Sequence, residues 1–199
     1  MQKALETLIV KQAVAEVVQR WGRARDQGLW DDLAATFHPG GTIKVMWFEG
    51  RHEDFIAACA KRFTPGVGST KHFFGMPVVE VNGARALSET AAQISMSGTI
   101  ADAQFISQSF VRFLDRFEPR NGEWRMVQRH CIYEGDRFLT DRPVELDARI
   151  LAMWKPPFRY LAYRQHLQGL TIDPETPMDG TPSLERLMRD ARAWIAGGA

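Results

Sequence analysis

Two residues of this sequence could together move a proton, although they lie in segments far apart in the chain. Asp26 ends a run with helical spacing of apolar residues, and His72 begins a strand-like run after a Gly-rich loop. Burial lowers the pKa of a histidine, whereas a carboxylate partner raises it and fixes the tautomer. The pair is therefore the smallest set of side chains that can act as an oriented general base near neutral pH. Taken singly, a capping aspartate and a structural histidine are the commoner interpretations.

Arg129 and His130 are two further candidates, and they are neighbours on one strand-like run. The arginine could stabilise an oxyanion or a leaving anion, and the histidine could act as a second acid. Because side chains alternate between the faces of a strand, only one of the two can face a pocket unless a bulge intervenes. The sequence leaves open which one does, and a surface ion pair is the simpler interpretation of Arg129.

Aromatic and soft side chains are the candidates for a binding cavity. Each alone is more often part of a core, but together they suit an apolar or aromatic ligand. The candidates are Trp21, Trp47, Phe55, Phe73, Phe74, Met76 and Phe105. Neither a phosphate loop nor a nucleophile elbow is found in the sequence. Adjacent side chains at residues 51–54 would diverge and make a poor metal site, so we expect no cofactor and no metal.

The elements that must position these residues follow an order of helices first and strands afterwards. Apolar spacing predicts helices over residues 4–25, 30–37 and 53–63, and strands over 42–48, 72–81, 84–97, 104–117 and 123–133. This order predicts an α+β fold in which a curved antiparallel sheet wraps the N-terminal helices and leaves a pocket between them. Residues 134–199 are Pro-rich, with helices expected over 145–154, 158–168 and from 181 onward.

Composition limits the class of protein. Of the 199 residues, 25 are basic and 24 acidic, which gives a net charge of +1 and argues against nucleic-acid or membrane binding by bulk charge. The sequence contains no apolar run of the length that spans a bilayer and no export signal, and its two cysteines suit a reducing compartment. We therefore expect a cytoplasmic protein with a domain over residues 1–133 and a helical extension over 134–199. That extension should pack on its own domain or on a neighbouring subunit.

An ordered set of short motifs resembles a known family. The set comprises the helix that ends in Asp26, then residues 28–37, 72–75, 79–86 and 121–126. In this order, over about residues 4–133, it resembles the SnoaL-like group of the nuclear transport factor 2-like superfamily, whose members include scytalone dehydratase, hexachlorocyclohexane dehydrochlorinase and bile-acid dehydratases. The resemblance implies a cystatin-like cone with an apolar internal cavity and assembly as a homodimer or homotrimer.

The resemblance also implies roles for single residues. His72 matches the general base of the group, Asp26 the aspartate that orients it, and Arg129 an arginine that assists the leaving group, with His130 as a competing candidate. Arg25 and Trp47 stand near positions where a group member holds a water with tyrosines, and Trp21 stands where another uses a lysine. The dyad is thus present, while the groups that set substrate and leaving group differ.

Two classes of function remain from the sequence. The first is a cofactor-independent lyase of the dehydratase type, acting by His–Asp proton abstraction on a small apolar, aromatic or polycyclic, hydroxylated substrate. An isomerase, or an enzyme that cleaves a carbon–carbon bond by retro-aldol release of an aldehyde, would use the same first step. The second class is a non-catalytic module that binds a small molecule or a protein. Retention of both Asp26 and His72 favours an enzyme, and the geometry of the pair distinguishes the two classes.

Overall fold

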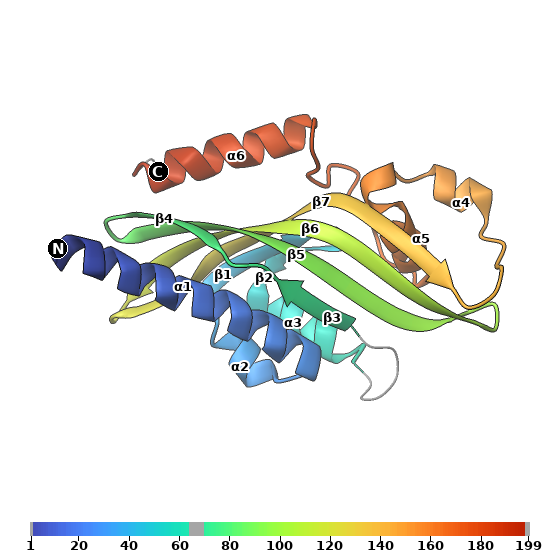
Figure 1. The fold of residues 1–199 in the computed structure, drawn as a ribbon, viewed down its shortest axis with the longest axis horizontal. Helices are drawn as coiled ribbons and strands as arrows, with labels where there is room; N and C mark the ends of the chain where they lie inside the picture. Colours follow the sequence, from blue (N-terminus) through green and yellow to red (C-terminus); the bar gives the residue numbers. More distant parts are fainter. Residues whose placement is uncertain (1, 64–69, 198–199) are drawn as a thin grey trace.

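One curved, unclosed sheet organises the molecule (Figure 1). The computed structural model describes residues 2–63 and 70–197. The strand order is β2-β1-β7-β6-β5-β3, with β4 paired to β5 beyond β3. The strands are β1 (Phe37–Val45), β2 (Phe48–Arg51), β3 (Thr70–Phe74), β4 (Val78–Asn82), β5 (Arg85–Ile100), β6 (Ala103–Arg120) and β7 (Glu123–Thr140). All neighbouring pairs are antiparallel except β1 and β7, which run parallel.

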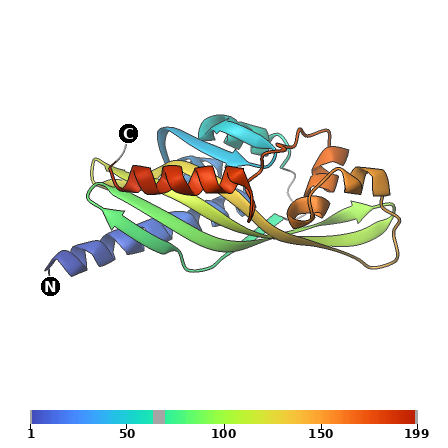
Figure 2. The same ribbon diagram turned by 90° about the horizontal axis from the view of Figure 1, so that it is seen from above.

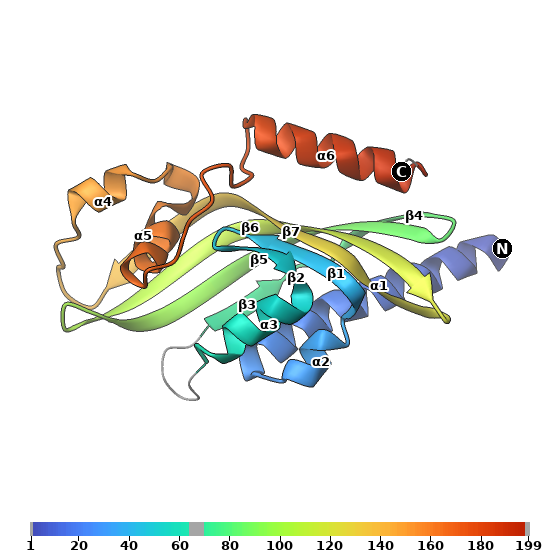
Figure 3. The same cartoon turned by 180° about the vertical axis from the view of Figure 1, so that it is seen from behind.

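Helices cover both faces of the sheet. In Figures 1 and 3, α1 (Gln2–Gln27), α2 (Trp30–Ala34) and α3 (His52–Ala60) lie on one side, and α6 (Pro182–Ile195) lies on the other. A third group consists of α4 (Ala148–Ala152), the short helix η1 (Pro156–Phe158) and α5 (Arg159–Leu167). Figure 2 shows this group near the end of the long strands, away from the free N-terminal half of α1. No helix in the described ranges is both long and apolar enough to cross a membrane.

The second half of α1 packs against the sheet because its apolar residues fall on one stripe. Val14, Val18 and Trp21 are fully or almost fully buried, and they share a core with Phe117 and Met126 of the sheet. A second core forms around η1 and α5, where Phe158 and Leu161 pack against the inner residues of β6 and β7. The sheet thus has one core under α1 and another under the C-terminal extension.

Glycine fixes one close approach between α1 and β3 and one tight turn between β6 and β7. A Cβ at Gly22 would lie 2.3 Å from a ring carbon of Phe74, so only glycine lets β3 approach α1 so closely. Asn121 and Gly122, with φ of 54° and 82°, form the tight turn between β6 and β7 that the Asn-Gly pair predicts. The close approach at Gly22 matters for the site, because it places the end of α1 beside β3.

The expected α+β architecture is confirmed, with differences in detail. The expected helix 30–37 ends at Ala34, because β1 begins at Phe37 and takes up the segment with Pro39. The expected strand 72–81 is two strands, since Pro77 has no N–H to donate and interrupts the ladder between β3 and β4. β7 continues to Thr140, so the expected boundary after residue 133 falls inside a strand, and the domain division stays a prediction.

Candidate active site

Asp26 in the last turn of α1 and His72 in β3 are joined by two hydrogen bonds. Oδ1 of Asp26 lies 2.6 Å from Nδ1 of His72, and Oδ2 accepts the backbone N–H of His72 at 2.8 Å. The two side chains are only 8% and 6% exposed. An ionised carboxylate can only accept, so Nδ1 carries the proton. Nε2 is then the ring nitrogen with a lone pair for a ligand.

The rings around His72 hold it in place and remove it from water. Trp21 contacts the imidazole edge-on with centroids 5.4 Å apart, and Phe74 stacks on it at 6.1 Å. Burial lowers the pKa of His72, and the hydrogen bond to Asp26 opposes this effect without reversing it. The positive charges of Arg25 and Arg129 lower it further. A neutral imidazole, the form that a general base needs, is therefore favoured near pH 7.

His72 lines a cavity of about 700 Å³ between the sheet and the helices. Four of the expected binding residues line the same cavity, each from a different element: Trp21 from α1, Trp47 from the β1–β2 turn, Phe55 from α3 and Phe105 from β6. The size suits a ligand of two or three rings.

Three expected lining residues lie elsewhere. Phe73 and Met76 are 61% and 84% exposed, because alternation turns Phe73 to the face opposite His72 and Met76 lies in the connection after β3. Neither lines the cavity, which corrects the sequence-based expectation. Phe74 shares the inner face with His72 but packs behind it, against Trp21 and Phe113. It supports the dyad without lining the cavity.

The C-terminal extension, which the sequence led us to expect on its own domain or on a neighbouring subunit, packs on its own domain and supplies much of the cavity wall. Leu161, Arg164 and Gln165 of α5 line it, and Arg164 contacts Met96 of β5 and Phe105 of β6. Tyr133 of β7 also lines the cavity, and its hydroxyl accepts a hydrogen bond from the backbone N–H of Met46 at 3.1 Å. Helical spacing in residues 158–168 was visible in the sequence, but no local pattern indicated which surface the helix would cover.

Arg129 lies on the inner face of β7 but does not reach the cavity. It is fully buried and forms two hydrogen bonds, of 2.8 and 2.6 Å, with the equally buried Asp115 of β6. Its guanidinium carbon lies 4.3 Å from the ring centroid of Trp21 and 4.6 Å from that of Phe113. Arg129 is therefore not placed to contact a leaving group in the cavity, because the rings of Trp21 and Phe113 line the cavity and Arg129 lies against them.

His130 faces the other side of the sheet, as strand alternation requires once Arg129 points inward. It lines a separate hollow beneath α6 with Lys44, Arg116 and Asp190 among its neighbours. Burial and the charges of Arg116 and Lys44 lower its pKa to about 4. The proposed role of His130 as a second acid at the dyad is thus incompatible with its position.

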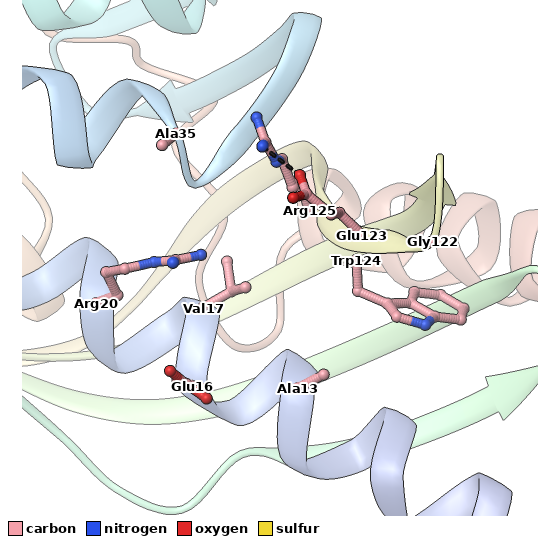
Figure 4. A pocket seen from close by; sticks show the side chains of 9 residues that line it. All are labelled: Ala13, Glu16, Val17, Arg20, Ala35, Gly122, Glu123, Trp124 and Arg125. Carbon is pink, nitrogen blue, oxygen red and sulfur yellow. Dashed lines mark hydrogen bonds and ion pairs between the residues drawn. The ribbon is translucent and has the colours of Figure 1, made fainter.

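Two other features can be separated from the site. His52 is a core residue, stacked on Phe37 at 4.7 Å and bonded through Nδ1 to the carbonyl oxygen of Gly41 at 3.1 Å. A hollow of about 290 Å³ lies between α1 and the β6–β7 turn (Figure 4). It is lined by Glu16 and Arg20 and by an ion pair of Arg125 with Glu123, and it does not include the dyad.

Comparison with known proteins supports the assignment of fold and family. The chain is similar to Pea pathogenicity protein 2 of Fusarium vanettenii, at 29% identity over 97% of this chain and 84% of that protein. A putative scytalone dehydratase from Novosphingobium aromaticivorans has a similar fold, with a TM-score of 0.57 and 14% identity over 73% of this chain and 94% of that one. The hexachlorocyclohexane dehydrochlorinase LinA type 2 has a TM-score of 0.60 and 10% identity over 73% and 99%. The resemblance inferred from the motifs is confirmed, and residues 6–130 match the SnoaL-like domain, so the chain belongs to the SnoaL-like family.

Proposed function

We propose that the protein is a cofactor-independent lyase in which His72 removes a proton from an activated C–H bond of a small aromatic or polycyclic, hydroxylated substrate. The single observation that carries the proposal is the 2.6 Å bond between Nδ1 of His72 and Asp26, on a histidine that lines a 700 Å³ cavity. A binding module needs neither a buried carboxylate nor a histidine held in one tautomer. A general base needs both.

The geometry of the dyad supports the following reaction. Nε2 of His72 takes the proton, and the electron pair of the broken C–H bond forms a double bond as the leaving group departs with its own pair. Asp26 stabilises the imidazolium that forms, because its carboxylate already accepts from Nδ1. The imidazolium returns its proton to the leaving hydroxide, which departs as water. Arg129 has a positioning role here, since it supports Trp21 from behind and does not touch the cavity.

Two related reactions begin in the same way. An isomerase would return the proton to another carbon, and a retro-aldol enzyme would take an O–H proton and release an aldehyde. The similarity in fold to a putative scytalone dehydratase and to a dehydrochlorinase supports elimination as the first choice.

A surrogate substrate tests the proposed base. 5-Nitrobenzisoxazole is a neutral aromatic whose ring opens when a base removes its one acidic C–H proton, which releases a coloured cyanonitrophenolate. We expect His72→Ala to lower the rate by roughly two to four orders of magnitude, the usual contribution of a general base. His166→Ala is the matched control, because His166 of α5 contacts Trp154 and does not line the cavity. Equal rates for His72→Ala and the wild type would refute the proposal.

We also propose a cytoplasmic homodimer or homotrimer. The N-terminal half of α1 supports an assembly, because Leu5, Leu8 and Ile9 are 58%, 62% and 60% exposed. Leu8→Asp should lower the mass measured by analytical ultracentrifugation to that of one chain. A wild type that sediments as a monomer at high concentration would contradict the proposed oligomer.

A further inference from the structure

The cavity beside the dyad carries an excess of positive charge. Arg25 of α1, Arg62 after α3 and Arg164 of α5 all line it, together with apolar and aromatic side chains. None of the described lining residues is an aspartate or glutamate. Within residues 2–63 and 70–197, none of the three arginines forms an ion pair with a carboxylate, and residues 64–69 contain no acidic residue.

Arg164 is the most constrained of the three. Its Nη1 lies 3.1 Å from the sulfur of Met96, and its guanidinium carbon lies 4.6 Å from the ring centroid of Phe105. Burial alone lowers its pKa to about 10. A thioether is a weak acceptor and a ring offers only its face, so most of the donors of this guanidinium lack a strong partner. Arg164 is partly buried, and a charge that loses much of its hydration normally has an anionic partner, because desolvation without one is costly.

The other polar groups of the cavity include two more arginines and a glutamine beside Arg164. Oε1 of the neighbouring Gln165 is buried and has no hydrogen-bond partner among the described residues. Arg62 lies over the ring of Trp47 at 3.9 Å, and its pKa is lowered by burial and by the nearby charge of Arg25. Arg25 in turn lies close enough to His72 to lower the pKa of that imidazole. An anion in this cavity would therefore relieve repulsion among the arginines.

We propose that the ligand of this cavity is an aromatic carboxylate, with its carboxylate paired to Arg164 and its ring system against Trp47, Phe55 and Phe105. The inference deepens the proposed function, since it names the substrate class of the same site. The planar guanidinium of Arg164 can donate two parallel hydrogen bonds to the two oxygens of a carboxylate.

A matched pair of probes tests the inference by isothermal titration calorimetry. Biphenyl-4-carboxylate and its neutral carboxamide have nearly the same shape and differ in charge. We expect the wild type to bind the acid at least tenfold more tightly, as a charge-assisted hydrogen bond in a desolvated site implies. Arg164→Met should remove this preference, while Arg164→Lys should retain part of it. Arg137→Met is the control, because Arg137 also lies over a ring, that of Phe110, but outside the cavity.

The outcomes separate this inference from the proposed function. Equal binding of acid and amide to the wild type, no binding of the acid at millimolar concentration, or an unchanged preference in Arg164→Met would overturn the inference. If Arg164→Met does not fold, Arg25→Met provides a second measurement and should weaken acid binding without affecting amide binding. His72→Ala should keep the preference for the acid while it loses elimination of the neutral 5-nitrobenzisoxazole. If the wild type shows no preference for the acid but eliminates 5-nitrobenzisoxazole through His72, the ligand inference fails and the proposed base stands. If it prefers the acid but His72→Ala eliminates at the wild-type rate, the proposed base fails and the ligand inference stands.

Discussion

The substitution Asp26→Asn is the most informative change at the dyad, because it preserves the shape of the side chain and removes its charge. In the wild type, one carboxylate oxygen faces Nδ1 of His72 and the other faces its backbone N–H, at 2.6 and 2.8 Å. An asparagine has one oxygen and one NH2 group for these two positions. Its oxygen must face the backbone N–H, since two donors cannot pair. The NH2 group then faces Nδ1 and forces the histidine proton onto Nε2, the nitrogen that the reaction needs free.

The magnitude follows from the cost of the alternative arrangement. To restore the reactive tautomer, the amide must turn and leave a buried N–H unpaired, which costs about 1–3 kcal/mol. This lowers the population of the reactive form roughly 5- to 150-fold. The neutral amide also stabilises the imidazolium less, by about 1 kcal/mol or a further fivefold. We therefore expect the rate of 5-nitrobenzisoxazole elimination to fall about 25- to 750-fold, less than in His72→Ala at the upper end of its range.

The assay combines kcat/KM with a direct view of the tautomer. Long-range 1H–15N correlation of the imidazole should show the proton on Nδ1 in the wild type and on Nε2 in Asp26→Asn. Asp32→Asn, on the surface of α2, serves as the control for loss of one negative charge. A variant that keeps its rate within twofold, or one that loses its rate while the proton stays on Nδ1, would refute the reasoning.

Three further predictions concern pH and the buried ion pair. Because burial lowers the pKa of His72 below its usual value of 6.5, the elimination rate should stay constant from pH 8 to about 6.5 and fall only at lower pH; an acidic limb centred above pH 7 would contradict this. The pKa of His130 is lowered to about 4, so the unfolded chain binds a proton more readily between pH 4 and 6.5, and the free energy of unfolding should rise with pH across that window by up to about 3 kcal/mol. His130→Gln should flatten this slope in urea titrations, and an unchanged slope would show that His130 is not its source. Arg129→Met leaves the carboxylate of Asp115 buried without its cationic partner and should lower the free energy of unfolding by about 3–5 kcal/mol. The double variant Arg129→Met/Asp115→Leu should recover much of this loss of stability. A double variant no more stable than Arg129→Met would show that the ion pair itself is needed.

The sequence predicted the architecture where local chemistry repeats along the chain. The apolar stripe that contains Val14, Val18 and Trp21 predicts α1, and alternation with Asn-Gly turns predicts the long strands. The sequence predicted the elements less well where one residue is compatible with two structures. Pro39 indicated the end of a helix, but it lies inside β1. The family resemblance placed Asp26 and His72 as a pair, and the 2.6 Å hydrogen bond between them is consistent with that expectation.

Tertiary structure decided which side chains meet, because contacts between distant segments depend on packing that no local pattern encodes. The alternation of side chains along a strand predicted that Arg129 and His130 lie on opposite faces of the sheet. Only the folded sheet showed that Arg129 is on the inner face and lies behind Trp21. Alternation likewise could not show that Met76 would lie in an exposed connection. The arginine of α5 is the clearest case: nothing near Arg164 in the sequence indicates a ligand, and its role follows from the desolvation it undergoes where α5 closes over the ends of β5 and β6. Residue types and spacing thus determined most of the elements and, with the family resemblance, indicated a candidate base, while burial in the folded chain determined which charges lack a partner.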